Sequence, residues 1–194
     1  MSVDDAGAFD ALVAAAAEGD QMALTALYRA HQPGLVRFLA GLVPDDAEDL
    51  AAETWIDISR SLATFEGGGQ DFRRLLFTIA RRRAIDHGRK RQRRRTEPTD
   101  LATHGGYAGG VDPSEVIAEL DSSRRAVHQI TKLLPHQQAE VILLRVVAGL
   151  SLSDVALIVG KSPGAVSVLQ TRGLQRLAAK IGNPTRLTRE SEPR

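Results

Sequence analysis

The 194-residue chain contains no cysteine, and this absence excludes several kinds of chemistry. Disulfide bonds, thiolate nucleophiles and cysteine-ligated zinc centres all require a thiol. A chain without thiols suits the reducing interior of a cell. Hydrophobic residues make up 43% of the sequence, which is enough for one domain of ordinary size or for two small ones.

Long hydrophobic runs are also missing. No window approaches the roughly 18 uninterrupted apolar residues of a membrane-spanning helix. The N-terminal stretch MSVDDAGAFD lacks the basic flank of a signal peptide. We therefore expect a soluble, cytoplasmic protein with no membrane insertion.

The sequence carries no enzymatic motif. VGKS at 159–162 imitates the end of a phosphate-binding loop, but Val155 stands where that loop needs its first glycine. HExxH is absent, no GxGxxG follows a strand, and the five histidines are scattered. We expect no catalytic residues, no metal and no cofactor, and hence a protein that acts by binding.

Charge is divided unevenly along the chain, although the net charge is only +1. Residues 1–66 hold twelve acidic and three basic residues, whereas residues 67–95 hold eleven basic and two acidic ones. The remainder is nearly balanced. An acidic block beside a basic block indicates two different partners, at least one of them polyanionic.

Helical periodicity dominates and alternating strand patterns are nearly absent, which predicts an all-α fold. We expect a first domain over residues 1–95, a Gly- and Pro-containing flexible linker over 96–112, a second domain over 113–182 and a disordered tail over 183–194. The helices expected in the first domain cover 9–17, 22–30, 35–43, 45–64 and a segment from Phe72 into the Arg-rich run, with a break or kink at Pro33-Gly34. In the second domain, helix is expected to resume at Ser114, break at Leu134-Pro135, continue to Val147 and restart after Gly149.

Residues 149–181 predict two short helices joined by a tight turn. Ser151 or Ser153 can cap the first helix, Gly160 supplies the turn, and Ser162-Pro163 is typical of a helix start. The residues expected to face inward are Val155, Ala156, Val159, Val166, Leu169 or Gln170, Leu174 and Leu177. This pattern favours a DNA-binding helix-turn-helix over an ordinary helical hairpin, which is the alternative. The residues expected to be exposed on its second helix are Lys161, Ser162, Gly164, Ala165, Ser167, Val168, Arg172 and Arg176.

Two faces stand out on the helices of the first domain. Asp45, Asp49, Glu53 and Asp57 recur every four positions on one face of the 45–64 helix, while Ala51, Trp55, Ile58 and Leu62 form its apolar face. Like charges at this spacing destabilise a helix, so the acidic face is either simply solvated or a docking surface for a basic partner.

The following helix begins amphipathic and ends basic. Phe72, Leu75, Leu76, Ile79 and Ala80 form a stripe that can pack on the core, and Arg74 and Arg81 are expected to point away from it. Beyond Ile85 basic residues surround the axis. This arrangement fits a surface that binds nucleic acid.

Four segments, in this order, resemble the extracytoplasmic-function (ECF, group 4) sigma factors of bacterial RNA polymerase. They are DDAEDLAAETW (45–55), FRRLLFTIARRRAIDHGRKRQRR (72–94), LLPHQQAEVILLRVVAGLSLSDVALIVGKSPGAV (133–166) and LQTRGLQRL (169–177). The resemblance spans nearly all of residues 8–182.

The resemblance implies a role for each segment. The 45–64 helix would dock on the polymerase through Asp45, Asp46, Asp49, Leu50, Glu53 and Asp57. The 72–95 helix and the loop before it would melt and bind the −10 promoter element through Phe65, Arg74, Arg81, Arg82, Asp86, Arg89, Lys90 and Arg91. The second domain would bind the −35 element through Lys161, Ser162, Gly164, Ala165, Ser167, Gln170, Arg172 and Arg176.

This chain departs from the family pattern at three places. Arg82 stands where many members have Asn, Leu75 stands where Trp is frequent, and Ser167 follows Val166 where a basic residue is common. The resemblance further implies core RNA polymerase, promoter DNA and an anti-sigma factor as partners. A free-standing helix-turn-helix regulator and a helical module with a nonspecific RNA-binding segment remain as alternatives.

Overall fold

The computed structural model describes residues 3–96, 123, 127–129 and 131–181, and every element assigned within them is helical. The linker and tail expected at 96–112 and 183–194, and the helix expected to resume at Ser114, lie almost entirely outside these residues. The helices are α1 (Val3–Ala17), α2 (Gln21–Leu42), η1 (Pro44–Asp46), α3 (Ala47–Leu62), α4 (Gly69–Thr96), α6 (His136–Ile142), η2 (Leu143–Val147), α7 (Leu152–Val159) and α8 (Pro163–Ile181).

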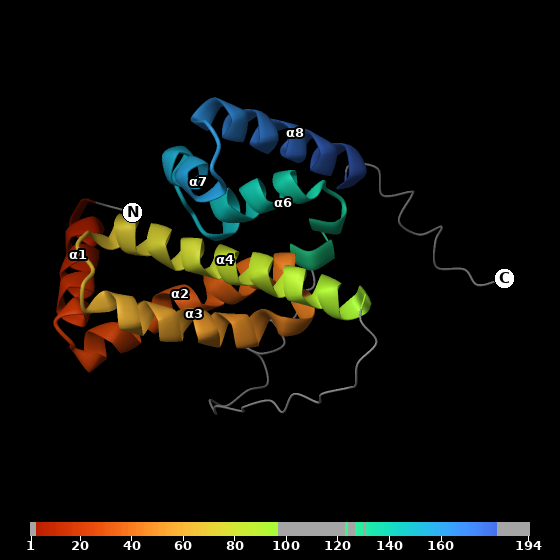
Figure 1. Ribbon diagram of the computed structural model, residues 1–194. Helices are drawn as coiled ribbons and strands as arrows, with labels where there is room; N and C mark the ends of the chain where they lie inside the picture. Colours follow the sequence, from red (N-terminus) through yellow and green to blue (C-terminus); the bar gives the residue numbers. More distant parts are fainter. Residues whose placement is uncertain (1–2, 97–122, 124–126, 130, 182–194) are drawn as a thin grey trace.

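The first domain is a bundle of α1 to α4, in which α2, α3 and α4 lie side by side and α1 crosses one end (Figure 1). α2 begins at Gln21 because the Asp20 side chain accepts hydrogen bonds from the backbone N–H groups of Met22 and Ala23. It then continues through Pro33 as one helix. The expected interruption at Pro33-Gly34 therefore does not separate two helices, because packing on both sides holds the chain helical.

The core of this bundle is apolar, with a few specific polar ties. The predicted inner face of α3 is confirmed, since Ala51, Trp55, Ile58 and Leu62 are all buried. The Trp55 indole donates a 2.7 Å hydrogen bond to the Gln32 side chain on α2. A polar ring N–H can be buried at little cost when it finds such a partner.

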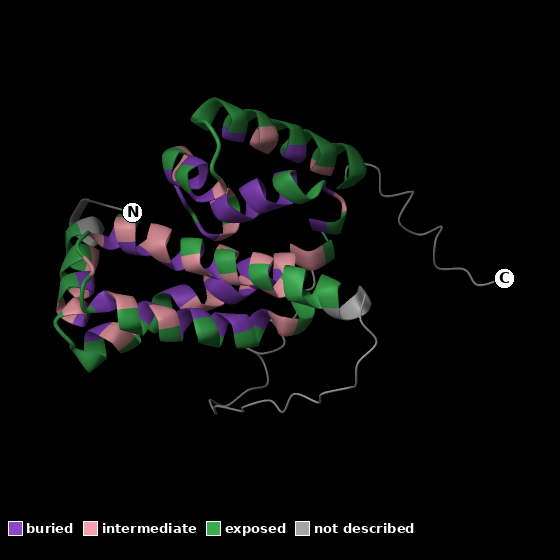
Figure 2. Ribbon diagram, viewed as in Figure 1, coloured by how far each residue is buried: buried purple, intermediate pink, exposed green. Residues whose placement is uncertain are grey.

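The predicted stripe on α4 is confirmed in part, and the buried side also includes Phe77 and Ala84. Phe72, Leu76 and Ala80 are fully buried, whereas Leu75 and Ile79 are only half-buried. α4 runs unbroken from the core stripe through the Arg-rich run. Burial is confined to its inner side, and the side chains become exposed toward its C-terminal end (Figure 2).

The second domain contains the predicted helix-turn-helix. Ser151 caps α7 by accepting a hydrogen bond from the Asp154 N–H at 3.1 Å. Gly160 ends α7 in the left-handed conformation (φ 65°), and Ser162 caps α8 through the Ala165 N–H at 3.2 Å. Each of these local signals was readable from the sequence.

Two details of the second domain differ from expectation. Leu174, expected to face inward, is 44% exposed, and Gly173 is buried in its place. A Cβ at Gly173 would lie 2.6 Å from the Ile142 side chain, so in this turn α8 packs against α6 at Gly173 and not at Leu174. Val166 is fully buried as expected.

The two domains are packed together. α6, η2 and α7 lie on α2 and α4, whereas α8 lies on the outer side of the second domain (Figure 1). One continuous cluster of buried hydrophobic residues includes Val36 and Ala40 of α2 together with Leu143 and Leu144 of η2. The domains therefore share part of their core.

Within the described residues, no single helix is long and apolar enough to cross a membrane. The α7 and α8 segments reach that length and composition only as a pair, and they are bent by 101° relative to each other.

Candidate functional site

The acidic face of α3 is covered in large part by basic residues of α4. Arg83 lies between Glu53 and Asp57: it pairs with Asp57 at 2.6 Å and also contacts the Glu53 carboxylate. One cation therefore bridges two carboxylates that lie one helical turn apart. The sequence pattern did not predict a role for Arg83. Its position two residues after Arg81, on the inner edge of α4, could have indicated one.

The N-terminal end of the acidic face is paired in the same way. Asp45 lies 3.0 Å from Arg91, and Asp46 lies 2.9 Å from the His87 ring. Arg91, which was predicted for DNA, thus also holds η1 against α4, together with His87. Among the four acidic residues spaced four positions apart, Asp49 alone makes no ion pair within the described parts of the chain. Its side chain is exposed.

Leu50, predicted with these acids, is buried in the core and lines the floor between the two helices. It therefore supports the surface instead of forming its exposed edge. A groove of about 610 Å³ follows the α3–α4 junction, and its walls carry charges of both signs. Among the described residues, no three His, Asp or Glu side chains converge as metal ligands would.

The outer side of α4 presents a row of exposed basic residues. The side chains of Arg82 and Arg89 are 85% and 70% exposed, and each lies just under 4 Å from Asp86 between them. Lys90 is also exposed. Ion pairs this open to solvent are weak, so these arginines remain available to a phosphate.

The loop before α4 places one aromatic side chain beside the bundle. Phe65 is half-buried, with its ring edge-to-face against Phe72 at 6.3 Å between centroids. Asp71 accepts a hydrogen bond from the Gly68 N–H and holds the loop at the start of α4. An anchored loop with a partly open aromatic ring is a suitable place for an unstacked base.

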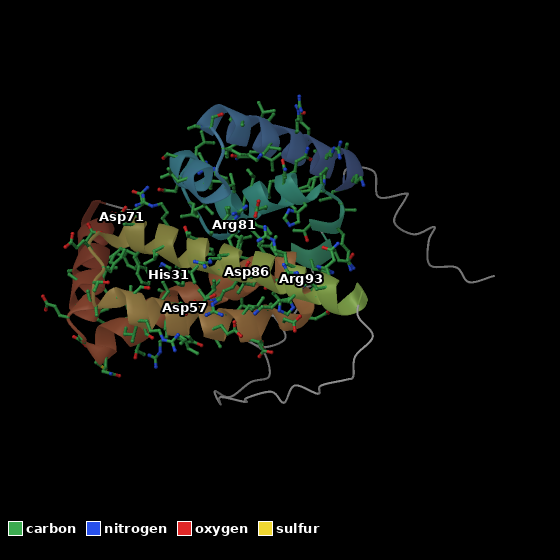
Figure 3. The ribbon with its side chains drawn as sticks, viewed as in Figure 1. His31, Asp57, Asp71, Arg81, Asp86 and Arg93 are labelled. Atoms are coloured by element: carbon green, nitrogen blue, oxygen red, sulfur yellow. The ribbon has the colours of Figure 1, made fainter. Side chains whose placement is uncertain are left out.

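Arg74 and Arg81 point away from the core stripe, as predicted, and both contact acidic side chains of the second domain. Arg81 donates a 2.7 Å hydrogen bond to Glu140 of α6, and Arg74 lies 3.3 Å from Asp154 of α7. Figure 3 shows Arg81 between α4 and the second domain. The periodicity of α4 correctly placed both arginines opposite the core stripe, but it contained no information on what covers them.

Asp154 is the most closely surrounded of these carboxylates. It accepts hydrogen bonds from the Gln70 side chain at 3.0 Å, from Arg74 and from Ser151. Burial by itself raises the pKa of Asp154, but these hydrogen bonds outweigh it and hold the pKa below its ordinary value. Asp154 is therefore ionised wherever the protein is folded at neutral pH.

α8 presents most of the predicted DNA contacts on an open surface. The exposed ones are Lys161, Ser162, Gly164, Ala165, Ser167, Arg172 and Arg176. Gln170 is the exception, because it is half-buried and its side chain oxygen accepts a 3.2 Å hydrogen bond from Arg145 of η2. Arg145 also donates to the Leu150 carbonyl, so this pair braces α8 against the turn before α7.

Comparison with known proteins gives the family of each domain. Residues 27–94 match the family model described as Sigma-70 region 2, and residues 124–177 match the one described as Sigma-70, region 4. The chain is 33% identical over 178 residues to the ECF RNA polymerase sigma factor SigD of Mycobacterium tuberculosis, covering 89% of this chain and 83% of SigD. It is 31% identical over 191 residues to the ECF RNA polymerase sigma factor ShbA of Streptomyces griseus, covering 92% of this chain and 98% of ShbA.

Solved structures agree on the fold. CnrH, solved in complex with the cytosolic domain of CnrY, superposes with a TM-score of 0.60 at 22% identity, covering 90% of this chain and 97% of that one. The sigma factor RpoE of Bartonella quintana, solved with the anti-sigma factor NepR, gives the same TM-score at 24% identity, covering 81% and 96%. The chain therefore belongs to the sigma-70 family and, within it, to the ECF RNA polymerase sigma factors.

Proposed function

We propose that this chain binds core RNA polymerase and directs initiation at promoters, with α3 docking on the polymerase, α4 opening the −10 element and α8 reading the −35 element. As a member of this family, it would act as an initiation factor and not as a catalyst. Residues 1–95 and 113–182 would form the two functional units. The cytoplasm is the compartment in which such a factor meets polymerase and DNA.

The observation that carries the proposal is the division of basic residues on α4. Arg83 pairs with acids of α3, and His87 and Arg91 lie against Asp46 and Asp45 of η1. Arg82, Arg89 and Lys90 face outward. A free-standing helix-turn-helix regulator would need only the second domain. The outward basic row and the exposed acid Asp49 have a purpose only if the first domain also meets a polymerase and a separated strand.

The exposed face of α8 supports the assignment of the −35 contacts. Its N-terminal residues Lys161, Ser162 and Ser167 are open, and the first turn of such a helix is what reaches base edges in a major groove. Arg172 and Arg176 lie farther along, where phosphate contacts position the helix. Gln170 would act by bracing α8 through Arg145.

CnrH and RpoE were each solved with a protein bound, and for RpoE that protein is named an anti-sigma factor. We extend this to the present chain as part of the proposal: a cognate anti-sigma protein would hold it inactive. Co-purification of tagged chain from native lysate tests both partners, since polymerase subunits and a small regulator would be recovered together.

Run-off transcription with bacterial core polymerase over a library of ECF-type promoters is the direct test. We expect initiation that depends on the added chain and starts downstream of matched −35 and −10 elements. Duplex binding without polymerase, together with no initiation across the library, would favour the free-standing regulator instead.

Asp49→Arg tests the docking face without disturbing the bundle, because Asp49 makes no ion pair in the described structure. We expect polymerase binding to weaken at least about tenfold, an effect of about 1.4 kcal/mol. The melting temperature should fall only slightly, because Asp49 lies in the first turn of α3, where an acidic side chain is favoured. Glu18→Arg, an equal charge change at the exposed end of α1, is the matched control and should bind as the wild type does. Equal affinity of both variants would remove Asp49 from the interface.

A further inference from the structure

α1 crosses the end of the bundle at which α4 begins, and two adjacent side chains of α1 reach that point (Figure 1). The Asp10 carboxylate accepts a 2.6 Å hydrogen bond from the N–H of Gly69, the first residue of α4. The Phe9 ring lies so close to the same glycine that a Cβ at Gly69 would overlap it. Both residues thus connect α1 to the start of α4.

The residue before α4 offers no side chain for capping. The first backbone N–H groups of a helix have no partner within it, and a side chain just before the helix usually accepts from one of them. Here that residue is Gly68, whose carbonyl accepts the first helical hydrogen bond from the Phe72 N–H at 2.9 Å. Asp10 supplies the missing acceptor from 59 positions earlier in the chain, and a carboxylate is favoured at this end of a helix.

A row of aromatic rings makes a second connection between α1 and the loop before α4. Phe9 stacks on His31 of α2 with 5.2 Å between ring centroids, and His31 meets the edge of Phe72 at 5.6 Å. Phe72 in turn meets the edge of Phe65, the aromatic side chain of the loop, at 6.3 Å. Aromatic pairs attract one another at these separations. Phe65 is thus packed, through two intervening rings, on a side chain of α1.

The loop itself, residues 63–68, approaches Asp10 closely. A Cβ at Gly68 would lie 2.5 Å from an Asp10 carboxylate oxygen, so this position needs glycine. The hydrogen bonds from the Phe65 N–H to the Leu62 carbonyl and from the Gly68 N–H to Asp71 each span three residues. These two bonds shape the loop but do not tie it to another helix, whereas Asp10 ties its end to α1.

We propose that α1 positions this loop for the −10 element. Asp10 holds the turn at its end, and Phe9 holds the Phe65 ring through the aromatic row, in the arrangement that accepts an unstacked base. Asp10 and Phe9 are positioning residues, which act through the loop and not by touching DNA. The inference rests on the proposed −10 role of the loop and α4. Loosening of α1 lowers the fraction of molecules whose loop is competent, and with it the apparent affinity for the strand.

The position of the loop can be followed directly, because a chain without cysteine accepts a single introduced thiol. Glu66→Cys places it at an exposed position of the loop, where a spin label reports local motion in the full-length chain. Asp10→Ala removes the acceptor for the Gly69 N–H and should make the label more mobile. Asp10→Asn keeps a side-chain oxygen and should restore the wild-type spectrum. Glu18→Ala, an equal loss of charge just after α1, is the matched control and should leave the spectrum unchanged.

The consequence for DNA is measured on the holoenzyme formed with core polymerase. The probe is a promoter that the run-off screen selects, prepared as a fork whose −10 non-template strand is already single-stranded, so that affinity reports strand capture without melting. We expect Asp10→Ala to bind the fork about fivefold to tenfold more weakly, as for a loop that is competent in about 10–20% of the molecules. Its affinity for polymerase should be unchanged, and Asp10→Asn should bind the fork as the wild type does.

Phe65 distinguishes positioning from general stability. Phe65→Ala removes the ring on which the base would stack, so it should weaken fork binding by about tenfold or more. If Asp10 acts through this ring, Asp10→Ala should weaken Phe65→Ala by less than about twofold. A general loss of stability would instead weaken binding by the same factor with or without the ring.

Phe9→Leu tests the aromatic connection separately, and it keeps the test decisive if Asp10→Ala perturbs folding, as judged by helicity and melting. Leucine fills much of the space of the ring but cannot stack on His31. Phe9→Leu should make the label more mobile and weaken fork binding in the same Phe65-dependent way.

The two assays separate the possible failures. Unchanged label mobility in whichever of Asp10→Ala and Phe9→Leu remain folded would overturn the hold of α1 on the loop. Greater mobility with unchanged fork binding, or a loss that is equally large without the Phe65 ring, would overturn the positioning role and leave the proposed promoter function intact. Absence of fork binding and initiation by the wild-type holoenzyme would overturn the proposed function and the positioning role with it. The label would still show whether α1 holds the loop.

Discussion

At the scale of single residues, His31 is a buried polar side chain of the first domain. Its ring stacks on Phe9 at 5.2 Å and meets the edge of Phe72 at 5.6 Å, and neither ring nitrogen has a hydrogen-bond partner among the described residues. Burial, together with the nearby charge of Arg73, lowers the pKa of His31 from 6.5 to about 4. The neutral ring serves as an aromatic packing element.

This burial predicts a specific loss of stability in mild acid. The pKa is lower in the folded chain than in the unfolded chain, so the stabilisation is complete above pH 6.5 and declines as the pH falls toward about 4. We expect a total loss of about 3 kcal/mol from this residue. Urea unfolding at pH 7 and at pH 4.5 should show this loss in the wild type. The same measurement on His31→Leu should lack the contribution.

Exposed His136 supplies the control, because His136→Gln should keep the wild-type pH dependence. An acid sensitivity that survives undiminished in His31→Leu would mean that groups other than His31 cause it.

Arg83 and Arg82 are neighbours in sequence, but Arg83 contacts acidic residues of α3 and Arg82 is largely exposed. Arg83→Ala leaves Glu53 and Asp57 facing each other without a cation, so we expect a loss of about 1 kcal/mol in the free energy of unfolding. Arg82→Ala removes an 85% exposed side chain and should change the same quantity by less than about 0.5 kcal/mol. Thermal melts of the two variants in parallel measure the difference, and equal melting temperatures would show that Arg83 is not a structural cation.

At the scale of elements, the two sides of α4 differ in role: one packs on the bundle and the other presents basic residues to solvent. The inner side carries the core stripe and the cations that hold α3, and the outer side carries Arg82 and Arg89. A single helix of 28 residues keeps these sides in fixed register. The proposed polymerase docking on α3 and the proposed strand capture on α4 would thereby be mechanically joined.

The double variant Arg82→Ala with Arg89→Ala should therefore impair promoter opening and spare polymerase binding. We expect open-complex formation, followed by permanganate footprinting of unstacked thymines, to fall at least about tenfold with polymerase affinity within about twofold of the wild type. A parallel loss in both assays would place these arginines at the polymerase interface.

Local signals predicted the elements well, because caps and apolar spacing act within one or two turns. The Ser162-Pro163 start of α8, the Gly160 turn and the buried face of α3 all follow from such short-range rules. The prediction that Leu174 faces inward was wrong, because whether Leu174 or Gly173 packs inward depends on the bulk of Ile142, which lies on another helix. The break predicted at Pro33 does not occur, because tertiary packing can hold a helix through a residue that favours a break.

At the scale of the whole molecule, the relation between the domains could not be predicted from spacing. Arg81 and Glu140 are far apart in sequence, and nothing in the periodicity of either helix indicates the other. The docking, −10 and −35 residues were proposed from the resemblance, and their individual roles stay predictions. What the structure adds is their division between an outward row, an inward row and a pair covered by the second domain.

The shared core of the two domains has one consequence for α2, because Gly41 and Gly34 also face η2 there. Alanine at Gly34 meets only ordinary contact, whereas alanine at Gly41 already requires Leu143 to move. A single methyl group at Gly41 would thus press on η2 from a position outside the predicted docking, −10 and −35 residues, so the packing between the two domains can be changed without altering any of those side chains.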